Sequence, residues 1–372
     1  MNGSPVRESG PASIAVRRVG AASLRRFALL SLPASPRVVL LGPNGTGKTT
    51  VLEAVHIGAT TVSFRTRRVR DLVRRGESAA RVRLGLGPDG GGRETASQEV
   101  VLAAGGCRYH RDGEEVRRMD LLGRVRVTPL LPGDLALVFG PPALRRRFLD
   151  LLVAQRDPSH GLRLLEVRRV ERRRRRILAE GGRGLSPWNR VLAPRLAAVA
   201  AARREAAAAL AAAARDRAAP FLPGGPSGRL SFRWDDALPE GPLTAEAVGE
   251  ALEAVRRDEL RLRRPKVSSA HCDLRIHLDG APAGRTASQG EGRAVAIALR
   301  LAAADLLGGG VLLVDDVWGE LDGTRRAALR EAIAGARQAF LAACDEAVLG
   351  ELLENARVFR LSADSDILDS DA

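Results

Sequence analysis

The chain has 372 residues, 45% of them hydrophobic, which is enough for one large domain or for two to three small ones. Its formal net charge of +15 favours polyanionic partners, nucleic acid first, although an arginine-rich and alanine-rich composition is equally what a GC-rich genome produces. Aromatic residues make up only 3%, which disfavours a single-strand-binding surface built on base stacking. Any contact with DNA is therefore expected to be mostly to phosphates and to weaken with salt.

The three cysteines, Cys107, Cys272 and Cys344, are widely spaced and form no Cys-x-x-Cys pair, which disfavours a disulfide scaffold and a zinc site. The sequence contains no run of about 18 apolar residues, so no membrane span is predicted. The N-terminal sequence MNGSPVRESGPAS is polar and lacks the apolar core of a signal peptide. We therefore expect a cytoplasmic protein with no membrane partner, and a disordered tail over residues 1–12.

The first predicted element is a buried parallel strand at residues 38–41, an apolar run of four residues. The segment GPNGTGKTT (42–50) follows it, and a helical pattern begins at Val51. Residues 80–110 alternate weakly between apolar and polar. Their glycine cluster GPDGGGRE (87–94) is typical of a hairpin-like loop.

Helical patterns dominate from about residue 130 to residue 264, with Pro/Gly breaks near 181–187 and 220–228. Residues 196–219 are almost entirely alanine, arginine and leucine and predict a helix. No heptad persists over many turns, so we expect a compact helical lobe and no long coiled coil. Residues 273–280 (DLRIHLDG) predict a strand that ends in an Asp-Gly turn.

The C-terminal segment predicts a Gly-rich turn and helix from Ser288, a strand at 311–316, a further helix and strand, and a polar, acidic tail. The predicted fold is a single α/β unit split by a helical insertion. Its parts are the N-terminal half of the unit (13–128), the helical lobe (129–264) and the C-terminal half (265–372).

The segment 42–49 matches the phosphate-binding pattern GxxxxGK[ST] in full, after a strand and at the start of a helix. Its glycines let backbone N–H groups turn toward phosphates. Lys48 is expected to reach the β- and γ-phosphates of ATP, and the hydroxyl of Thr49 to bind Mg²⁺. The predicted nucleotide contacts in this segment are Gly42, Pro43, Asn44, Gly45, Thr46, Gly47, Lys48, Thr49 and Thr50.

The run VLLVDD (311–316) predicts the second strand of such a site. Many strands end in an aspartate pair, so this run indicates a functional site only in combination with the phosphate-binding loop. Asp315 is suited to bind Mg²⁺ through water, and Asp316 is placed to polarise the attacking water.

The order of these motifs resembles the ATP-binding-cassette (ABC) head of the SMC-like ATPases and, over nearly the whole chain, the RecF family. The similar segments are LRRF (24–27), GPNGTGKTTVLEAV (42–55), PLLPGDLALVFGPPALRRRFLDLLVAQRDP (129–158) and the stretch from ASQGEGR to GELD (287–322). Segment 129–158 is the most specific, because generic cassette ATPases lack it. The resemblance implies ATP-dependent dimerisation on DNA with slow hydrolysis. It also implies help in loading recombinase at gaps or junctions, together with RecO and RecR mediators.

The resemblance also implies roles for residues outside the phosphate-binding loop. Ser288 and Gly290 are expected to contact the γ-phosphate of the ATP bound by a partner subunit. Asp322 is expected in the loop that links the two active sites, and Arg25 close to the nucleotide.

The chain departs from the family pattern at four places. Glu291-Gly292-Arg293 stands where the family usually has Gln-Gln-Arg, and 269–273 (Ser-Ala-His-Cys-Asp) lacks an arginine and an aspartate. Ser63-Phe64-Arg65 replaces Ser-His-Arg, and Arg26 replaces an asparagine. These departures favour a divergent member and leave a second hypothesis open, a DNA clamp that binds ATP but barely hydrolyses it. A small-molecule kinase is disfavoured, because a kinase needs neither the Ser-Gln-Gly turn nor the basic excess.

Ser288-x-x-Glu291 also matches a capping box, in which each side chain accepts a hydrogen bond from the other residue's backbone N–H. Such a cap competes with phosphate for the helix N-terminus, and its carboxylate opposes the anion. We therefore expect Glu291→Gln to tighten ATP-driven dimerisation.

Residues 145–176 contain 12 arginines and four acidic residues, and five of the arginines are consecutive. Two interpretations stay open for this segment, a solvated helix and a track for DNA phosphates. The predicted DNA contacts are Arg172, Arg173, Arg174, Arg175 and Arg176.

Overall fold

The computed structural model describes residues 14–89, 92–222, 224–225, 228–362 and 367–369, so the predicted tail at 1–12 lies outside the described residues. The chain divides into two compact units. Unit 1 comprises Met1–Pro129, Gly309–Glu320 and Leu329–Ala372, and unit 2 comprises Leu130–Gly308 and Leu321–Ala328. Residues 265–308, which the sequence analysis assigned to the C-terminal half of the head, thus belong with the helical segment that precedes them.

Unit 1 contains a mostly parallel six-stranded sheet in the order β15-β14-β3-β13-β12-β8. Its strands β3, β12, β13 and β14 are parallel to one another, and β15 is antiparallel to β14. The predicted strand at 38–41 is confirmed as β3, whose apolar residues are buried, as expected for a strand covered on both faces. The strands are β3 (Arg37–Leu41), β8 (Val127–Leu130), β12 (Val311–Asp315), β13 (Gln338–Ala343), β14 (Arg357–Leu361) and β15 (Ile367–Asp369).

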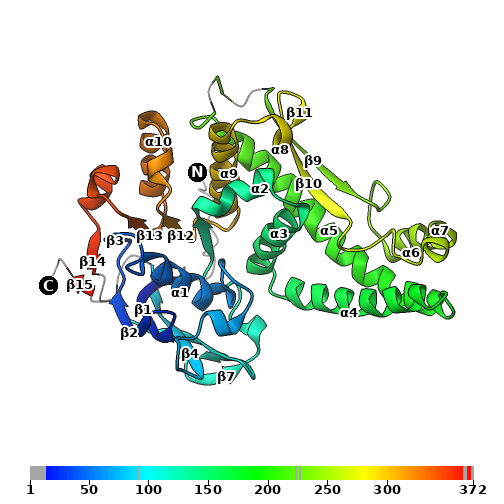
Figure 1. Cartoon of the computed structure of the whole chain (residues 1–372), viewed down its shortest axis with the longest axis horizontal. Helices are drawn as coiled ribbons and strands as arrows, with labels where there is room; N and C mark the ends of the chain where they lie inside the picture. The colour runs from blue at the N-terminus through cyan, green and yellow to red at the C-terminus, as the bar shows by residue number, and fades with distance from the viewer. Residues whose placement is uncertain (1–13, 90–91, 223, 226–227, 363–366, 370–372) are drawn as a thin grey trace, which may run out of the picture. The chain divides into compact units, whose positions relative to one another are not determined.

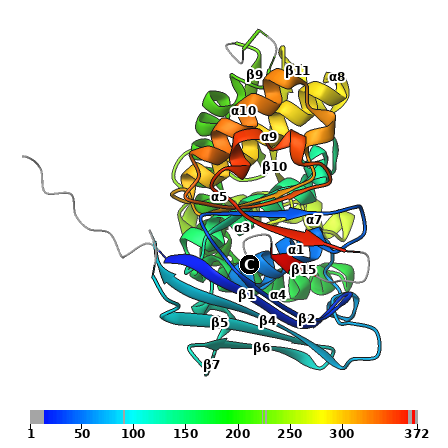
Figure 2. The same ribbon diagram turned by 90° about the vertical axis from the view of Figure 1, so that its left-hand side faces the viewer.

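A second sheet of unit 1 is antiparallel and runs in the order β2-β1-β4-β5-β6-β7 (Figure 2). The predicted hairpin of residues 80–110 is confirmed as β4 and β5, although residues 90 and 91 lie outside the described part. The strands are β1 (Ile14–Leu24), β2 (Phe27–Pro33), β4 (Ala79–Pro88), β5 (Ala96–Ala103), β6 (Gly106–Arg111) and β7 (Glu114–Val116).

Helix α1 (Lys48–Thr60) contacts both sheets of unit 1, and all of its residues except Thr49 are buried (Figure 1). The core around it includes Val51, Leu52 and Val55, with side chains from both sheets. The helix that begins at the phosphate-binding loop is therefore fixed on every side. Short 3₁₀ helices lie elsewhere in unit 1: Val69–Asp71, Arg118–Asp120, Glu346–Val348 and Gly350–Leu353.

Unit 2 consists mainly of helices. Helix α5 (Leu185–Ala218) confirms the predicted helix at 196–219, and helix α9 (Gln289–Leu306) packs along it. The other helices are α2 (Ala136–Phe139), α3 (Pro142–Arg156), α4 (Ser159–Ala179), α6 (Ala245–Ala254), α7 (Arg256–Leu262) and α8 (Ala283–Thr286), with a 3₁₀ helix at Pro132–Leu135.

Unit 2 also contains a small antiparallel sheet, β11-β10-β9. Its strands are β9 (Leu230–Asp236), β10 (Cys272–Leu278) and β11 (Ala281–Pro282). The predicted Asp-Gly turn is confirmed, because Leu278 pairs with Ala281 and leaves Asp279 and Gly280 as a two-residue loop in which both φ angles are positive. Trp318–Glu320 form a 3₁₀ helix, and helix α10 (Gly323–Ala334) begins in unit 2 and ends in unit 1. Among the described residues, no helix combines the length and the apolar character needed to cross a membrane.

Candidate nucleotide site

The phosphate-binding loop follows β3 and needs glycine at two of its positions. Gly42 has φ 149° and Gly47 has φ 111°, both in a region that L side chains rarely adopt. A Cβ added at Gly42 would lie 2.4 Å from the carbonyl oxygen of Leu361, and one at Gly47 would lie 2.6 Å from the ring of Phe27. The backbone of this loop is therefore held in the conformation that turns N–H groups toward an anion.

Lys48 is the first residue of α1 and is only 5% exposed. Its Nζ donates to the carbonyl of Gly42 and, at 2.9 Å, to that of Pro43, which holds the amine inside the loop. The hydroxyl of Thr46 also donates to the Pro43 carbonyl, at 3.0 Å. Thr50 is buried and its N–H donates to the carbonyl of Gly47, which begins the helix. The phosphate-binding loop and the positive end of the α1 dipole thus both border the site expected for the phosphates.

The strand order brings Asp315 to the loop. Asp315 ends β12, and β13 lies between β12 and β3, so the carboxyl end of β12 meets the loop that follows β3. The hydroxyl of Thr49 donates to Oδ1 of Asp315 at 3.0 Å. Burial raises the pKa of Asp315. The hydrogen bond from Thr49 opposes that rise, and the neighbouring Asp316 adds to it.

Thr49 and Asp315 fit a magnesium ion bound together with a nucleotide. Within the described part of the chain, no group of three or more His, Cys, Asp or Glu side chains is arranged to hold a metal by itself. Mg²⁺ commonly takes one or two protein oxygens and completes its octahedron with phosphate oxygens and water. A hydroxyl and a carboxylate oxygen 3.0 Å apart beside a phosphate-binding loop provide that partial set.

Cys344 lies in this site and was missed by the sequence analysis, which treated it only as one of three scattered cysteines. Its Sγ lies 3.2 Å from Oδ2 of Asp316, 3.1 Å from Oδ1 of Asn44 and 3.4 Å from Nζ of Lys48. Burial and the contact with Asp316 raise the pKa of the Cys344 thiol, so it is a neutral donor. Cys344 directly follows β13, and ligand-binding residues collect at the carboxyl ends of parallel strands, which is the signal that could have identified it.

Arg25 and Arg26 both reach the segment that carries the loop. Arg25 donates from Nε and Nη2 to the carboxylate of Glu53, at 2.5 Å and 2.9 Å, and Glu53 is fully buried on α1. Ser63, from one of the segments that depart from the family pattern, also donates to Glu53. Arg26, which stands where the family has asparagine, donates from Nη1 to the carbonyl of Gly45. The structure therefore brings Arg26 onto the loop itself and ties Arg25 to the helix that follows it.

The turn at Ser288, in unit 2, has the predicted capping box. Ser288 is the N-cap of α9; the Glu291 N–H donates to its Oγ at 3.2 Å, and the Ser288 N–H donates to Oε2 of Glu291 at 2.9 Å. The Ser288 hydroxyl in turn donates to the same carboxylate oxygen at 2.9 Å. Asp322 is exposed, and its Oδ1 accepts from the N–H of Arg325 at 2.9 Å.

The structure corrects one member of the predicted DNA-contacting set. Arg174 is completely buried in unit 2, where its Nη2 donates to Oε2 of Glu259 at 2.7 Å and its Nε donates to Oδ1 of Asn189 at 2.8 Å. A guanidinium that is paired inside the core cannot contact a phosphate. The other four arginines of the run, Arg172, Arg173, Arg175 and Arg176, are exposed on α4.

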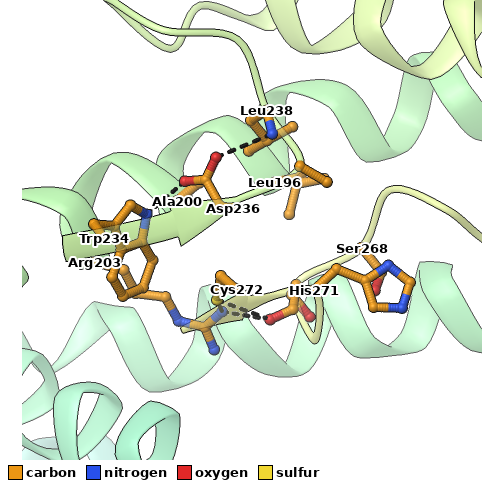
Figure 3. A pocket seen from close by; sticks show the side chains of 11 residues that line it. Leu196, Ala200, Arg203, Trp234, Asp236, Leu238, Ser268, His271 and Cys272 are labelled. Carbon is orange, nitrogen blue, oxygen red and sulfur yellow. Dashed lines mark hydrogen bonds between the residues drawn. The ribbon is translucent and has the colours of Figure 1, made fainter. Parts of the chain in front are cut away.

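The departure at 269–273 lies beside a small pocket of unit 2 (Figure 3). The guanidinium of Arg203, from α5, lies 3.4 Å from Sγ of Cys272 and donates to the carbonyl of Ser269. Asp273 forms an ion pair with Arg145, which donates to it from Nε at 2.7 Å. The positive charge of Arg203, on α5, thus lies beside Cys272 in the segment that lacks its own arginine.

Comparison with known proteins gives consistent results over nearly the whole chain. Residues 16–365 match the family model described as RecF/RecN/SMC N terminal domain. The chain is 34% identical over 359 residues to the DNA replication and repair protein RecF of Streptomyces avermitilis, which covers 91% of this chain and 95% of that protein. It is 36% identical over 352 residues to the protein of the same name from Frankia alni, covering 87% of this chain and 91% of that protein.

Solved structures show the same fold. A structure of the recombination mediator protein RecF with ATP, 21% identical, superposes with a TM-score of 0.84 and covers 98% of this chain and 100% of that one. An SMC head bound to the C-terminal winged-helix domain of ScpA, 13% identical, gives a TM-score of 0.56 over 95% of this chain and 97% of that chain. The predicted fold class, an SMC-like P-loop ABC-ATPase head, is confirmed.

Proposed function

Because the chain belongs to the RecF family, as the resemblance in its sequence predicted, we propose that it is an ATP-dependent DNA-binding protein of recombinational repair and replication. One observation carries this proposal. The hydroxyl of Thr49 and the carboxylate of Asp315 meet at 3.0 Å beside the phosphate-binding loop, although 266 positions separate them in the chain. The Asp-Asp strand, which is ambiguous alone, and the phosphate-binding loop thus form one site suited to a nucleotide and Mg²⁺.

In this site the residues of the chain have separate tasks. Backbone N–H groups of the phosphate-binding loop and the amine of Lys48 would bind the phosphates, and Thr49 and Asp315 would hold Mg²⁺, which would neutralise charge on the transferred phosphoryl group. Asp316 orients the attacking water. Its φ of 42° and the hydrogen bond from its N–H to the Ala342 carbonyl, at 3.1 Å, fix the backbone that aims its carboxylate. The thiol of Cys344 holds that carboxylate from the other side.

We propose further that ATP joins two copies of the chain head to head on DNA, with Ser288 and Gly290 of one copy meeting the γ-phosphate bound by the other. DNA is held through phosphate contacts, and slow hydrolysis releases the dimer. In this role the protein helps recombinase loading at gaps, together with mediators of the RecO and RecR type.

One observation favours the second hypothesis, a clamp with little hydrolysis. The Ser288 hydroxyl donates to Glu291 at 2.9 Å, so its proton is already engaged by a carboxylate of its own chain. A γ-phosphate must displace that hydrogen bond before it can use the hydroxyl. The expected consequence is a weak or slowly formed dimer and low turnover.

The test compares molecular mass by sedimentation velocity, with ATP, with ADP and without nucleotide, in the presence and absence of duplex DNA. ATP hydrolysis is measured in parallel. Lys48→Ala is expected to abolish nucleotide binding and dimerisation. Asp316→Asn is expected to keep both and to lower hydrolysis by on the order of 10²-fold.

The matched control is Lys266→Ala. Lys266 is the only other lysine of the chain and forms a surface ion pair with Asp258, so its removal changes charge without touching the site. A wild-type mass that does not respond to nucleotide, with phosphate passed to a small acceptor, would refute the proposal in favour of a kinase. A dimer that forms with ATP and DNA but shows no turnover would establish the clamp instead.

A further inference from the structure

The turn at Ser288 contains no lysine and carries the carboxylate of Glu291, yet two arginines from other segments lie against it. The first is Arg229, directly before β9. Its Nη2 donates to Oε1 of Glu291 at 2.9 Å, and its Nε and Nη2 donate to the carboxylate of Asp279 at 2.8 Å and 2.9 Å. Arg229 therefore bridges the turn at Ser288 and the β10–β11 turn, both within unit 2.

These contacts keep Glu291 charged and oriented. The backbone and hydroxyl of Ser288, followed by the guanidinium of Arg229, lower the pKa of Glu291. One oxygen of Glu291 faces Ser288 and the other faces Arg229. The guanidinium of Arg229, which also pairs with Asp279, thus partly compensates the carboxylate on the side away from the serine.

The second arginine is Arg325, three residues after Asp322. Its Nε donates to the carbonyl of Phe221 at 2.9 Å, and its side chain is only 16% exposed. Its Nη1 lies 3.3 Å from the place that a Cβ on Gly290 would occupy. Within the described part of the chain, its two terminal nitrogens form no hydrogen bond. They are donors next to the first turn of α9, held in place by the third nitrogen.

We propose that Arg325 contacts the phosphate that meets the Ser288 turn, and that Arg229 is a positioning residue that acts through Glu291. The inference rests on the proposed function, in which that phosphate is the γ-phosphate of a nucleotide bound by a second copy of the chain. Arg325 supplies the positive charge that the turn itself lacks. Arg229 offsets part of the charge of Glu291, so that the capping box repels the anion less than a carboxylate without a partner would.

The close approach of Arg325 also bears on the glycine at position 290. A Cβ there would lie 3.3 Å from Nη1 of Arg325, so the end of that side chain would have to shift by a few tenths of an ångström. Gly290 thus serves the approach of Arg325 as well as that of a phosphate.

The experiment measures dimer dissociation by sedimentation velocity in ATPγS and Mg²⁺, with thermal unfolding of every variant as a check on folding. Arg325→Gln is expected to weaken the dimer by about 10- to 100-fold, the loss typical of a hydrogen bond to a charged group. Arg325→Lys is expected to recover part of it, because lysine keeps the charge but not the planar geometry. Arg229→Gln is expected to weaken the dimer by about 5- to 10-fold, and to have no effect in a Glu291→Gln chain if it acts through Glu291.

Two controls are matched in charge and in local contacts. Arg326→Gln removes the next residue along the same helix, whose Nε also donates to a backbone carbonyl, that of Leu321, at 2.9 Å. Arg217→Gln removes an arginine that is also paired with a carboxylate of α9, Asp305. Both are expected to dimerise like the wild type.

Binding of a fluorescent ATP analogue is measured below the dimerisation concentration, where only a chain's own phosphate-binding loop contributes. It is expected to be unchanged in every variant. If Arg325→Gln dimerises as well as Arg326→Gln, the phosphate role of Arg325 is wrong. If Arg229→Gln weakens the dimer by the same factor in the Glu291→Gln chain as in the wild type, the proposal that Arg229 acts through Glu291 is wrong. A wild-type chain that stays monomeric in ATPγS overturns the proposed dimer together with this inference.

Discussion

The DNA track proposed on α4 can be tested cleanly because the structure separates its arginines. Taking 100° per residue, Arg172, Arg173, Arg175 and Arg176 cover one face of roughly 160°, and Arg174 lies on the opposite side. Arg174 is buried against Glu259, and the other four are exposed. The perturbation is therefore a fourfold arginine-to-glutamine variant that keeps Arg174, because removing the fifth would confuse lost binding with lost stability.

The expected magnitude follows from counterion release. Each phosphate neutralised on duplex DNA contributes about 0.9 to the slope of log affinity against log salt. Four contacts give a slope change of about 3.6, and three give about 2.7. The lower figure applies if Arg173 stays over the ring of Trp188, where its guanidinium carbon lies 5.9 Å from the ring centre. We expect the slope of log affinity against log salt to be smaller in the fourfold variant than in the wild type, by about 2.7 to 3.6.

The assay is fluorescence anisotropy of a labelled duplex titrated with protein at several salt concentrations. The control removes the same charge from exposed arginines near α7 in the same unit: Arg256, Arg257, Arg261 and Arg264. An equal fall in slope for the control would show a general field effect. An unchanged slope in the fourfold variant would refute the track and leave these arginines as a solvated helix face.

Two further predictions concern the stability of unit 2. Arg174→Gln is expected to lower the free energy of unfolding by about 3–5 kcal/mol, because it leaves the fully buried Glu259 without its ion-pair partner. The control Arg172→Gln is expected to change it by no more than about 0.5 kcal/mol. Urea titration of both variants measures these values, and equal values would contradict the role of the buried pair. The second concerns Asp150: burial alone would raise its pKa, but hydrogen bonds from His160 and Arg203 outweigh burial and hold the pKa below its usual value. A lowered folded-state pKa gives stability that is present above the unfolded-state value and is lost as the pH falls through the folded-state value. Urea titrations between pH 7 and pH 3 should therefore show an acid loss that Asp150→Asn reduces, and identical pH profiles would argue against this assignment.

The phosphate-binding loop could be predicted in full because its geometry is encoded within a few consecutive residues. Gly42 and Gly47 have the positive φ angles that only glycine adopts easily, and Lys48 binds carbonyls five and six residues before it. The capping box of Ser288 and Glu291 is equally local and was predicted correctly. Thr49 and Asp315 were each predicted to bind Mg²⁺, and the placement of β12 and β3 in one parallel sheet brings them together.

Other site residues could not be predicted, because no local pattern encodes their contacts. Cys344 reaches Lys48 across 296 positions of the chain, and only the placement of β13 beside β3 brings them together. Arg26 lies in the LRRF segment, but its contact with the Gly45 carbonyl depends on the pairing of β1 with β2, which that segment does not encode by itself.

The sequence by itself thus determined the fold class and the family, and it identified the residues proposed to bind phosphate and metal, because these depend on short motifs with fixed backbone geometry. The tertiary structure determined which arginine side chains are exposed, which are buried, and which lie beside the Ser288 turn. It buried Arg174 against Glu259, and it set Arg229 and Arg325 around the Ser288 turn. The physical reason is that the surroundings of an arginine depend on which distant acid or carbonyl packs against it, and five arginines that look alike along a helix differ as soon as one side of that helix is buried.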